Sequence, residues 1–136
     1  MQINPYLHFN GDCEEAFNFY AKALGGEIAF KITYAESPMA GETAKELLGK
    51  IMHARLQIGG NVIMGSDAPP GRYKEPQGFS VSISVESAAD AERIYKALEE
   101  GGDVYMPLAE TFWAERFGML ADRFGVPWMI NCEKKS

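Results

Sequence analysis

Few side chains in this sequence of 136 residues suit acid–base or metal chemistry near neutral pH. The two histidines are His8 and His53, and Glu115 stands among aromatic residues in the segment TFWAERFGML. Because histidine titrates near neutral pH, His53 and Glu115 are candidates for an acid and a base, or for a divalent metal site that His8 would complete. The alternative is that each is an ordinary solvated or hydrogen-bonded side chain on a strand.

Strand alternation indicates which way these side chains point. In IMHARLQI the apolar set, expected to face a core, is Met52, Ala54, Leu56 and Ile58. The polar set on the other face is His53, Arg55 and Gln57. In the first strand-like segment, INPYLHF, Leu7 and Phe9 are the core positions, which turns Tyr6 and His8 to the open side.

Two segments near the end of the chain follow the same alternation. In TFWAERFGML we expect one face to carry Trp113, Glu115, Phe117 and Met119. In VPWMIN, Trp128 and Ile130 belong to the core, and Met129 and Asn131 share the other face. Small-molecule sites are mostly apolar with a few fixed polar groups. The side chains expected to contact a ligand are therefore Tyr6, His8, Arg55, Met64, Trp113, Phe117, Met129 and Asn131.

The helices and strands that position these residues occur in two similar copies along the sequence. In the first copy a capping box, Asp12 to Glu15, opens a helix, and Gly25-Gly26 ends it. The apolar stripe of this helix is Cys13, Ala16, Phe17, Tyr20 and Leu24. The strand-like segments EIAFKITY and IMHARLQIGGNVIMGSD follow it.

In the second copy FSVSISV is a half-buried strand, Ser87 caps the next helix, and Gly101-Gly102 closes it. The helical stripe is Ala91, Ile94, Tyr95 and Leu98. Three more strands come from DVYMPL, TFWAERFGML and VPWMIN.

The order strand, helix, strand, strand, strand therefore occurs twice, which predicts an α+β domain of two βαβββ units. We expect one domain over 1–136, with unit one at about 1–67, a linker at about 68–77 that could also serve as a lid, and unit two at about 78–136. A single helix covers only part of a sheet. Two such units would leave a shared concave surface, the expected ligand site.

The amino-acid composition excludes some classes of binding partner. With 13 Lys plus Arg against 19 Asp plus Glu, the net charge of −6 argues against nucleic acid or an anionic membrane as the main partner. The chain starts MQINPYLHF, without a signal-like or membrane-spanning segment, so we expect a cytoplasmic protein. Cys13 and Cys132 are expected to be buried thiols.

Four stretches together resemble the PhnB-like branch of the vicinal oxygen chelate superfamily, which includes glyoxalase I, extradiol dioxygenases and bleomycin-resistance proteins. They are NPYLHFNGDCEEAFNFY, IMHARLQIGGNVIMGSD, ETFWAERFG and DRFGVPWMIN, and they span nearly the whole chain. The resemblance implies a cupped mixed sheet built from two βαβββ units. It also implies a homodimer.

Enzymes of that superfamily hold a divalent metal with His and Glu on the first and last strands of each unit. The positions that match here are Pro5 (or Asn4), Met64, Ser80 and Met129, none of which is a histidine or a carboxylate. Such side chains make a poor site for a divalent ion. We expect the usual metal centre to be lost or shifted. The cofactor is therefore unknown: it could be a divalent metal at another position, or the protein could have no cofactor.

Two functions remain as hypotheses. One is a small-molecule enzyme of lyase, isomerase or oxygenase type whose metal site is shifted or lost. The other is a non-catalytic protein that sequesters an apolar or aromatic compound, as bleomycin-resistance relatives do. Relatives often carry a methyltransferase name, but the glycine pairs follow helices or close a hairpin rather than opening a helix after a strand, so we do not expect methyl transfer.

Overall fold

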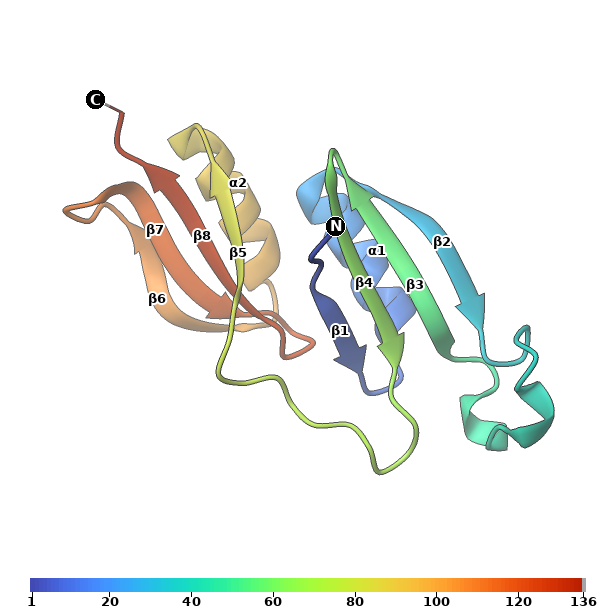
Figure 1. The fold of residues 1–136 in the computed structure, drawn as a ribbon. Helices are drawn as coiled ribbons and strands as arrows, with labels where there is room; N and C mark the ends of the chain where they lie inside the picture. The colour runs from blue at the N-terminus through green and yellow to red at the C-terminus, as the bar shows by residue number, and fades with distance from the viewer. Residues whose placement is uncertain (136) are drawn as a thin grey trace. The chain divides into compact units, whose positions relative to one another are not determined.

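The chain forms two similar compact units, Met1–Lys74 and Glu75–Ser136. The computed structural model describes residues 1–135, and each unit holds one four-stranded mixed sheet and one longer helix (Figure 1). The predicted α+β class with a repeated βαβββ order is confirmed. The boundary between the units falls inside the segment 68–77 that the sequence predicts as a linker.

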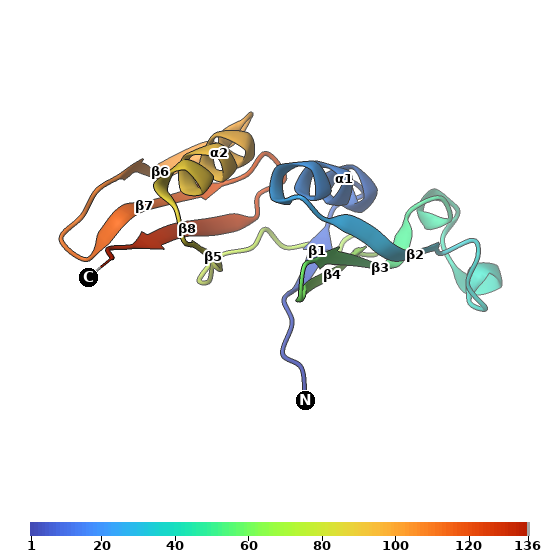
Figure 2. The same ribbon diagram turned by 90° about the horizontal axis from the view of Figure 1, so that it is seen from above.

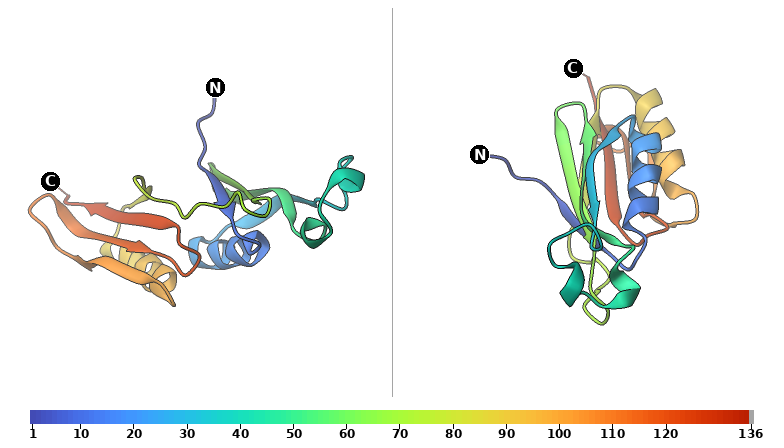
Figure 3. Two further views of the ribbon diagram at one scale, coloured as in Figure 1. Left: turned by 90° about the horizontal axis from the view of Figure 1, so that it is seen from below. Right: turned by 90° about the vertical axis from the view of Figure 1, so that its right-hand side faces the viewer.

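Unit 1 contains β1 (Tyr6–Phe9), α1 (Cys13–Leu24), β2 (Glu27–Thr33), β3 (Ile51–Ile58) and β4 (Asn61–Asp67). Its sheet has the strand order β1-β4-β3-β2, in which β1 and β4 are parallel and the other pairs are antiparallel. Two short 3-10 turns, Ala40–Glu42 and Lys45–Leu47, lie beyond the ends of β2 and β3 (Figure 3).

Unit 2 repeats this plan with β5 (Val81–Val85), α2 (Ala88–Glu99), β6 (Asp103–Ala109), β7 (Ala114–Ala121) and β8 (Pro127–Glu133). The order is β5-β8-β7-β6, with β5 parallel to β8 and the remaining pairs antiparallel. In each unit one helix lies along one face of its own sheet (Figure 2). The other face of each sheet is the one on which we expect the site residues.

The core of unit 1 lies between α1 and its sheet. Phe17 and Tyr20 of α1 are fully buried, as are Leu7 and Phe9 of β1. Gly65 is required on β4, because a Cβ atom there would come within 2.8 Å of the Phe17 ring. Position 65 therefore faces the helix, and Met64 and Ser66 beside it face away.

The core of unit 2 has the same construction. Tyr95 of α2 is buried, and a Cβ atom on Gly118 would lie 2.7 Å from its ring. Trp128 and Ile130 of β8 are fully buried, which confirms their predicted core positions. Gly118 faces the helix, so Phe117 and Met119 point to the other side of the sheet.

The two helices begin in different ways. Ser87 accepts a hydrogen bond from the backbone N–H of Asp90 at 3.1 Å, so the second predicted cap is confirmed. The predicted capping box at Asp12 is wrong, because the Asp12 side chain caps nothing. Instead, the carboxylate of buried Asp67 accepts the N–H of Cys13 at 2.9 Å and that of Ile51 at 2.8 Å.

Both cysteines are buried and free, as the sequence predicts. Among residues 1–135 no helix is long and apolar enough to cross a membrane.

Candidate functional site

The open face of the unit 1 sheet, the one away from α1, carries most of the unit 1 candidates. The register pairs Phe30 with Arg55, Arg55 with Met64, and Met64 with Tyr6, so one row crosses all four strands. Residues paired in this way share a face. We call this face the unit 1 open face and define it by Tyr6, His8, Phe30, His53, Arg55 and Met64.

Tyr6 and His53 form a hydrogen-bonded pair on this face. The Tyr6 hydroxyl lies 3.0 Å from His53 Nδ1, and the two rings stack with centroids 5.6 Å apart. The His8 ring lies 5.2 Å from the Tyr6 ring, and the Phe30 ring 6.1 Å from that of His53. Four aromatic or imidazole rings therefore gather beside Met64, and Tyr6 remains 39% exposed.

Arg55 is exposed at the centre of the same face. It takes part in no hydrogen bond, ion pair or ring contact with any other side chain among residues 1–135. No acidic residue occurs in its row or in the next row that holds His53. Arg55 is therefore the one charged side chain in these two rows, and Glu27 lies in the row on its other side.

The open face of the unit 2 sheet carries the remaining candidates. One row there runs from Ser84 to Asn131 to Phe117 and ends at Ala109, and the next from Ser82 to Met129 to Met119 to Met106. The Trp113 ring packs edge-on against Phe117, with centroids 5.4 Å apart. We define the unit 2 open face by Trp113, Phe117, Met119, Met129 and Asn131.

Asn131 has an unsatisfied acceptor. Its Oδ1 atom is buried and has no hydrogen-bond partner among residues 1–135. A buried acceptor without a donor costs about 1–3 kcal/mol, so such an atom is uncommon in a folded protein. Asn131 as a whole is half-buried, so a rotation of its amide would bring this atom to a ligand N–H or O–H group and remove the cost.

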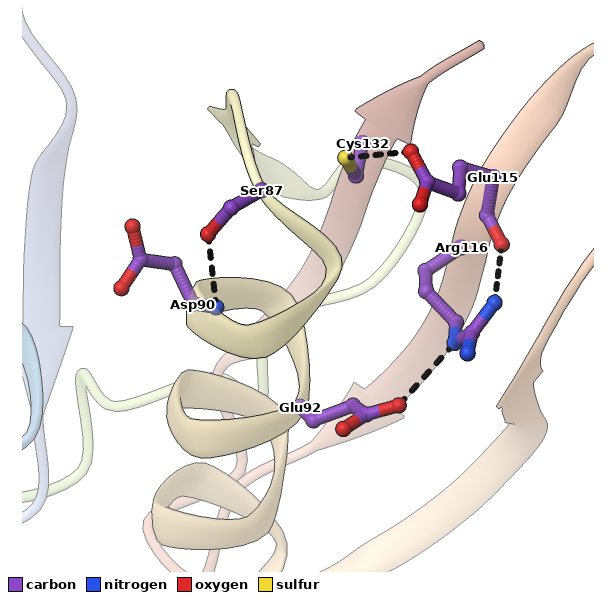
Figure 4. Close-up of polar contacts among 6 residues, drawn as sticks. All are labelled: Ser87, Asp90, Glu92, Glu115, Arg116 and Cys132. Atoms are coloured by element: carbon purple, nitrogen blue, oxygen red, sulfur yellow. Dashed lines mark hydrogen bonds and ion pairs between the residues drawn. The ribbon is translucent and has the colours of Figure 1, made fainter.

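Glu115 does not share the face of Trp113 and Phe117, which corrects the expectation from simple alternation. The pairing of β7 with β8 shifts between Ala114 and Arg116, and this irregularity breaks the period of two. The Glu115 carboxylate lies 3.9 Å from the Sγ atom of Cys132, a fully buried residue that alternates with Asn131 on β8 (Figure 4).

The neighbours of Glu115 belong to the helix side of unit 2. Next to it, Arg116 reaches Glu92 of α2 at 3.1 Å (Figure 4). Burial and then the Glu115 carboxylate raise the pKa of the Cys132 thiol, which keeps the sulfur protonated and unreactive near neutral pH. His53 belongs to unit 1 and Glu115 to unit 2, so their joint action stays a prediction.

At two of the four positions that the resemblance assigns to metal ligands, this chain carries methionine. Met64 and Met129 lie on the two open faces, next to Tyr6 and Ser82 in the register. Thioether and hydroxyl groups are poor ligands for hard or borderline divalent ions. Within residues 1–135, no three His, Cys, Asp or Glu side chains are grouped as a metal site would need.

Two features of unit 1 were not predicted from the sequence. One is Phe30, which a shift in the β2–β3 register between Ile28 and Phe30 turns into the row of Arg55. The other is a small acidic pocket of about 270 Å³ beside the start of α1, lined in part by Asp12, Glu15, Lys50 and Asp67. Burial raises the pKa of Asp12 in this pocket.

The chain is similar to known proteins along nearly its whole length. A sequence profile of the 3-demethylubiquinone-9 3-methyltransferase family matches residues 1–131. The solved structure of protein PA1353 from Pseudomonas aeruginosa is 50% identical, covers 99% of both chains and superimposes with a TM-score of 0.92. A putative 3-demethylubiquinone-9 3-methyltransferase, PhnB protein, from Bacillus cereus is 25% identical over 97% of this chain and 99% of its own, with a TM-score of 0.81.

A more distant structure supports the fold alone. The glyoxylase/bleomycin resistance protein/dioxygenase domain from Frankia sp. EAN1pec is 17% identical, covers 98% of each chain and has a TM-score of 0.70.

Proposed function

Because the chain belongs to the 3-demethylubiquinone-9 3-methyltransferase family, the PhnB-like branch of the vicinal oxygen chelate fold, we propose that it binds a small, flat, mainly apolar molecule on its open sheet faces. The observation that carries this proposal is the buried, unsatisfied Oδ1 of Asn131 beside Phe117. An apolar face with one desolvated acceptor is chemically suited to an aromatic ligand that donates one hydrogen bond.

Trp113 offers a direct way to observe such binding. The chain has two tryptophans, and Trp113 is 47% exposed whereas Trp128 is buried with its Nε1–H bonded to Asp122 at 2.8 Å. In a ¹⁵N-labelled sample each indole N–H gives one NMR signal, and Trp113→Phe assigns them. We expect unlabelled indole to shift the Trp113 signal and to leave the Trp128 signal in place.

The hydrogen bond to Asn131 is tested with 1-methylindole, which has the same ring without the N–H group. Indole should bind about five-fold tighter than 1-methylindole to the natural protein, since one net hydrogen bond contributes about 1 kcal/mol. Asn131→Leu should abolish this difference, whereas Asn18→Leu on the exposed side of α1 should keep it. A Trp113 signal that never moves, or equal affinities in all proteins, argues against the proposal.

Methyl transfer is not part of this proposal. A nucleotide-type methyl donor is usually held by a glycine-rich turn between a strand and a helix in a doubly wound parallel sheet. Here each sheet has one parallel pair, β1 with β4 or β5 with β8. Membership of a family does not by itself establish an activity.

The enzyme alternative rests on the Tyr6–His53 hydrogen bond, because a paired phenol and imidazole can move a proton. A divalent metal held at a shifted position by His53 and Glu115 stays a prediction from the sequence. A homodimer and a cytoplasmic location are also predictions.

A further inference from the structure

We infer that the unit 1 open face takes a flat compound with an ionisable hydroxyl group, a phenol or an enol, which passes its proton to His53 through Tyr6 while Arg55 binds the resulting anion. This inference rests on the proposed small-molecule function and adds the class of ligand and the role of three residues. It concerns unit 1 by itself.

The first step is the direction of the Tyr6–His53 hydrogen bond. When the Tyr6 hydroxyl donates to His53 Nδ1, as their 3.0 Å separation allows, the neutral imidazole carries its own proton on Nε2. Nδ1 is then the basic atom, and the Tyr6 oxygen has a free lone pair on the exposed side of the pair. A ligand hydroxyl can donate to that oxygen.

Proton transfer through the pair is balanced. The ligand O–H bond breaks and its proton joins the Tyr6 oxygen, while the Tyr6 hydroxyl proton moves to His53 Nδ1. Tyr6 ends as a neutral phenol, His53 becomes an imidazolium, and the ligand becomes an anion. No oxidant, reductant or metal is needed for this step.

The second step is the place of the anion. The Tyr6 ring reaches across β4 to His53 on β3, and Arg55 stands two residues further along β3 on the same face. A ligand oxygen bonded to the Tyr6 hydroxyl therefore lies beside the strand that carries Arg55, whose long side chain can turn toward the resulting anion. Arg55 has no partner of its own among residues 1–135, so its guanidinium is available to the anion.

The surrounding charges agree with an anionic product. The ionisable groups that face the pair are His8 beside Tyr6, Arg55 on β3, and Tyr34, whose hydroxyl donates to the Asp67 carbonyl at 2.8 Å. Glu27 lies one row further, paired with Gln57, and forms no ion pair with Arg55. Arg55 is therefore the charged side chain nearest to the pair, and Glu27 lies beyond it.

The probe for this inference is p-nitrophenol, whose phenolate form is coloured and whose hydroxyl ionises near neutral pH. We expect its visible absorption to rise when the full-length protein is added at a pH where the free compound is partly protonated. The ratio of phenolate to phenol should increase about three-fold or more for the bound compound, because the pair accepts the proton and Arg55 stabilises the anion. Tyr6→Phe and His53→Gln should lower this increase to the part that Arg55 alone provides.

Arg55 is tested by affinity. Arg55→Gln should weaken phenolate binding by about five-fold, as expected for loss of a charge-assisted contact. Arg72→Gln removes the same charge from an exposed residue of unit 1 outside the open face and should leave the affinity unchanged. Equal effects of the two substitutions would mean that only net charge matters, which overturns the role of Arg55.

The matched ligand p-nitroanisole separates this inference from the proposed function. It has the same ring but no proton to give, and we expect it to bind to the natural protein and to Tyr6→Phe alike, which also shows that the variant is folded. If p-nitroanisole binds but p-nitrophenol shows no extra ionisation, or if Tyr6→Phe keeps that ionisation, the proton-transfer inference is wrong and small-molecule binding stands. If neither compound binds, the proposal for this face fails as well.

Discussion

Asp67 shows how one side chain connects three parts of unit 1. It ends β4, is only 1% exposed, and accepts the N–H of Cys13 at the start of α1 and the N–H of Ile51 at the start of β3. Its backbone carbonyl also accepts the Tyr34 hydroxyl at 2.8 Å. The Asp67 carboxylate therefore caps the start of α1, which is the role that the sequence predicts for Asp12, although Asp67 lies far from α1 along the chain.

Asp67→Ala should lower the free energy of unfolding by about 3 kcal/mol, because two backbone N–H groups lose a charged acceptor in a buried place. Urea unfolding followed by circular dichroism measures the change. Asp103→Ala is the matched control, since Asp103 on β6 is exposed, and it should change stability by less than about 0.5 kcal/mol. Similar losses in both variants would show that Asp67 is not the connection described here.

Alternation in the sequence assigned faces to the candidate residues, and it failed where a strand pairing is irregular, at Phe30 and at Glu115. Tyr6, Arg55 and Met64 were assigned to the open side of unit 1, and the register brings them into one row. Glu115 was assigned with Trp113 and Phe117, but the irregularity in β7 turns it to Cys132. A single extra residue in a ladder leaves no clear mark in the order of apolar and polar residues.

At the scale of elements, each helix packs on its sheet over a glycine. A Cβ atom at Gly65 would lie 2.8 Å from the Phe17 ring and 3.0 Å from the Leu7 carbonyl oxygen. An alanine at this position would therefore fit only if these groups moved apart. In unit 2, a Cβ atom at Gly118 would meet the Tyr95 ring in the same way. Close approach of helix and sheet therefore depends on these two glycines.

We expect Gly65→Ala to destabilise the protein by about 1–3 kcal/mol through overpacking of α1 against β4. Thermal unfolding measures the effect, and Gly65→Ala combined with Phe17→Leu should recover part of it by making room for the methyl group. Gly60→Ala is the control, since a Cβ atom there meets nothing within 4 Å. An unchanged melting temperature in Gly65→Ala would contradict the close contact.

The repeated elements were the easiest feature to predict, because helical stripes and strand alternation are local patterns. The Ser87 cap followed from local chemistry and is present at 3.1 Å. The start of α1 depends instead on Asp67, which is 54 residues from Cys13 along the chain. Contacts between residues so far apart in sequence have no local signature, which is why the cap at Asp12 was wrong.

At the scale of the whole molecule, the edge strand β6 is unusual. It has one neighbour, β7, and its Val104, Tyr105 and Met106 side chains are all exposed. Pro107 within β6 limits backbone pairing at this edge, but the exposed apolar side chains can still be covered by another chain. A second copy of the chain that covers β6 would explain its composition, which supports the predicted homodimer.

Light scattering coupled to size exclusion should therefore give twice the 15.0 kDa mass of one chain. Tyr105→Lys places a charge on the exposed edge and should shift the population toward monomer, because a buried unpaired charge is costly at an interface. Ala44→Lys adds the same charge at an exposed position of unit 1 and should leave the mass unchanged. A 15.0 kDa species at every concentration would refute the homodimer, and a dimer that survives Tyr105→Lys would place the interface away from β6.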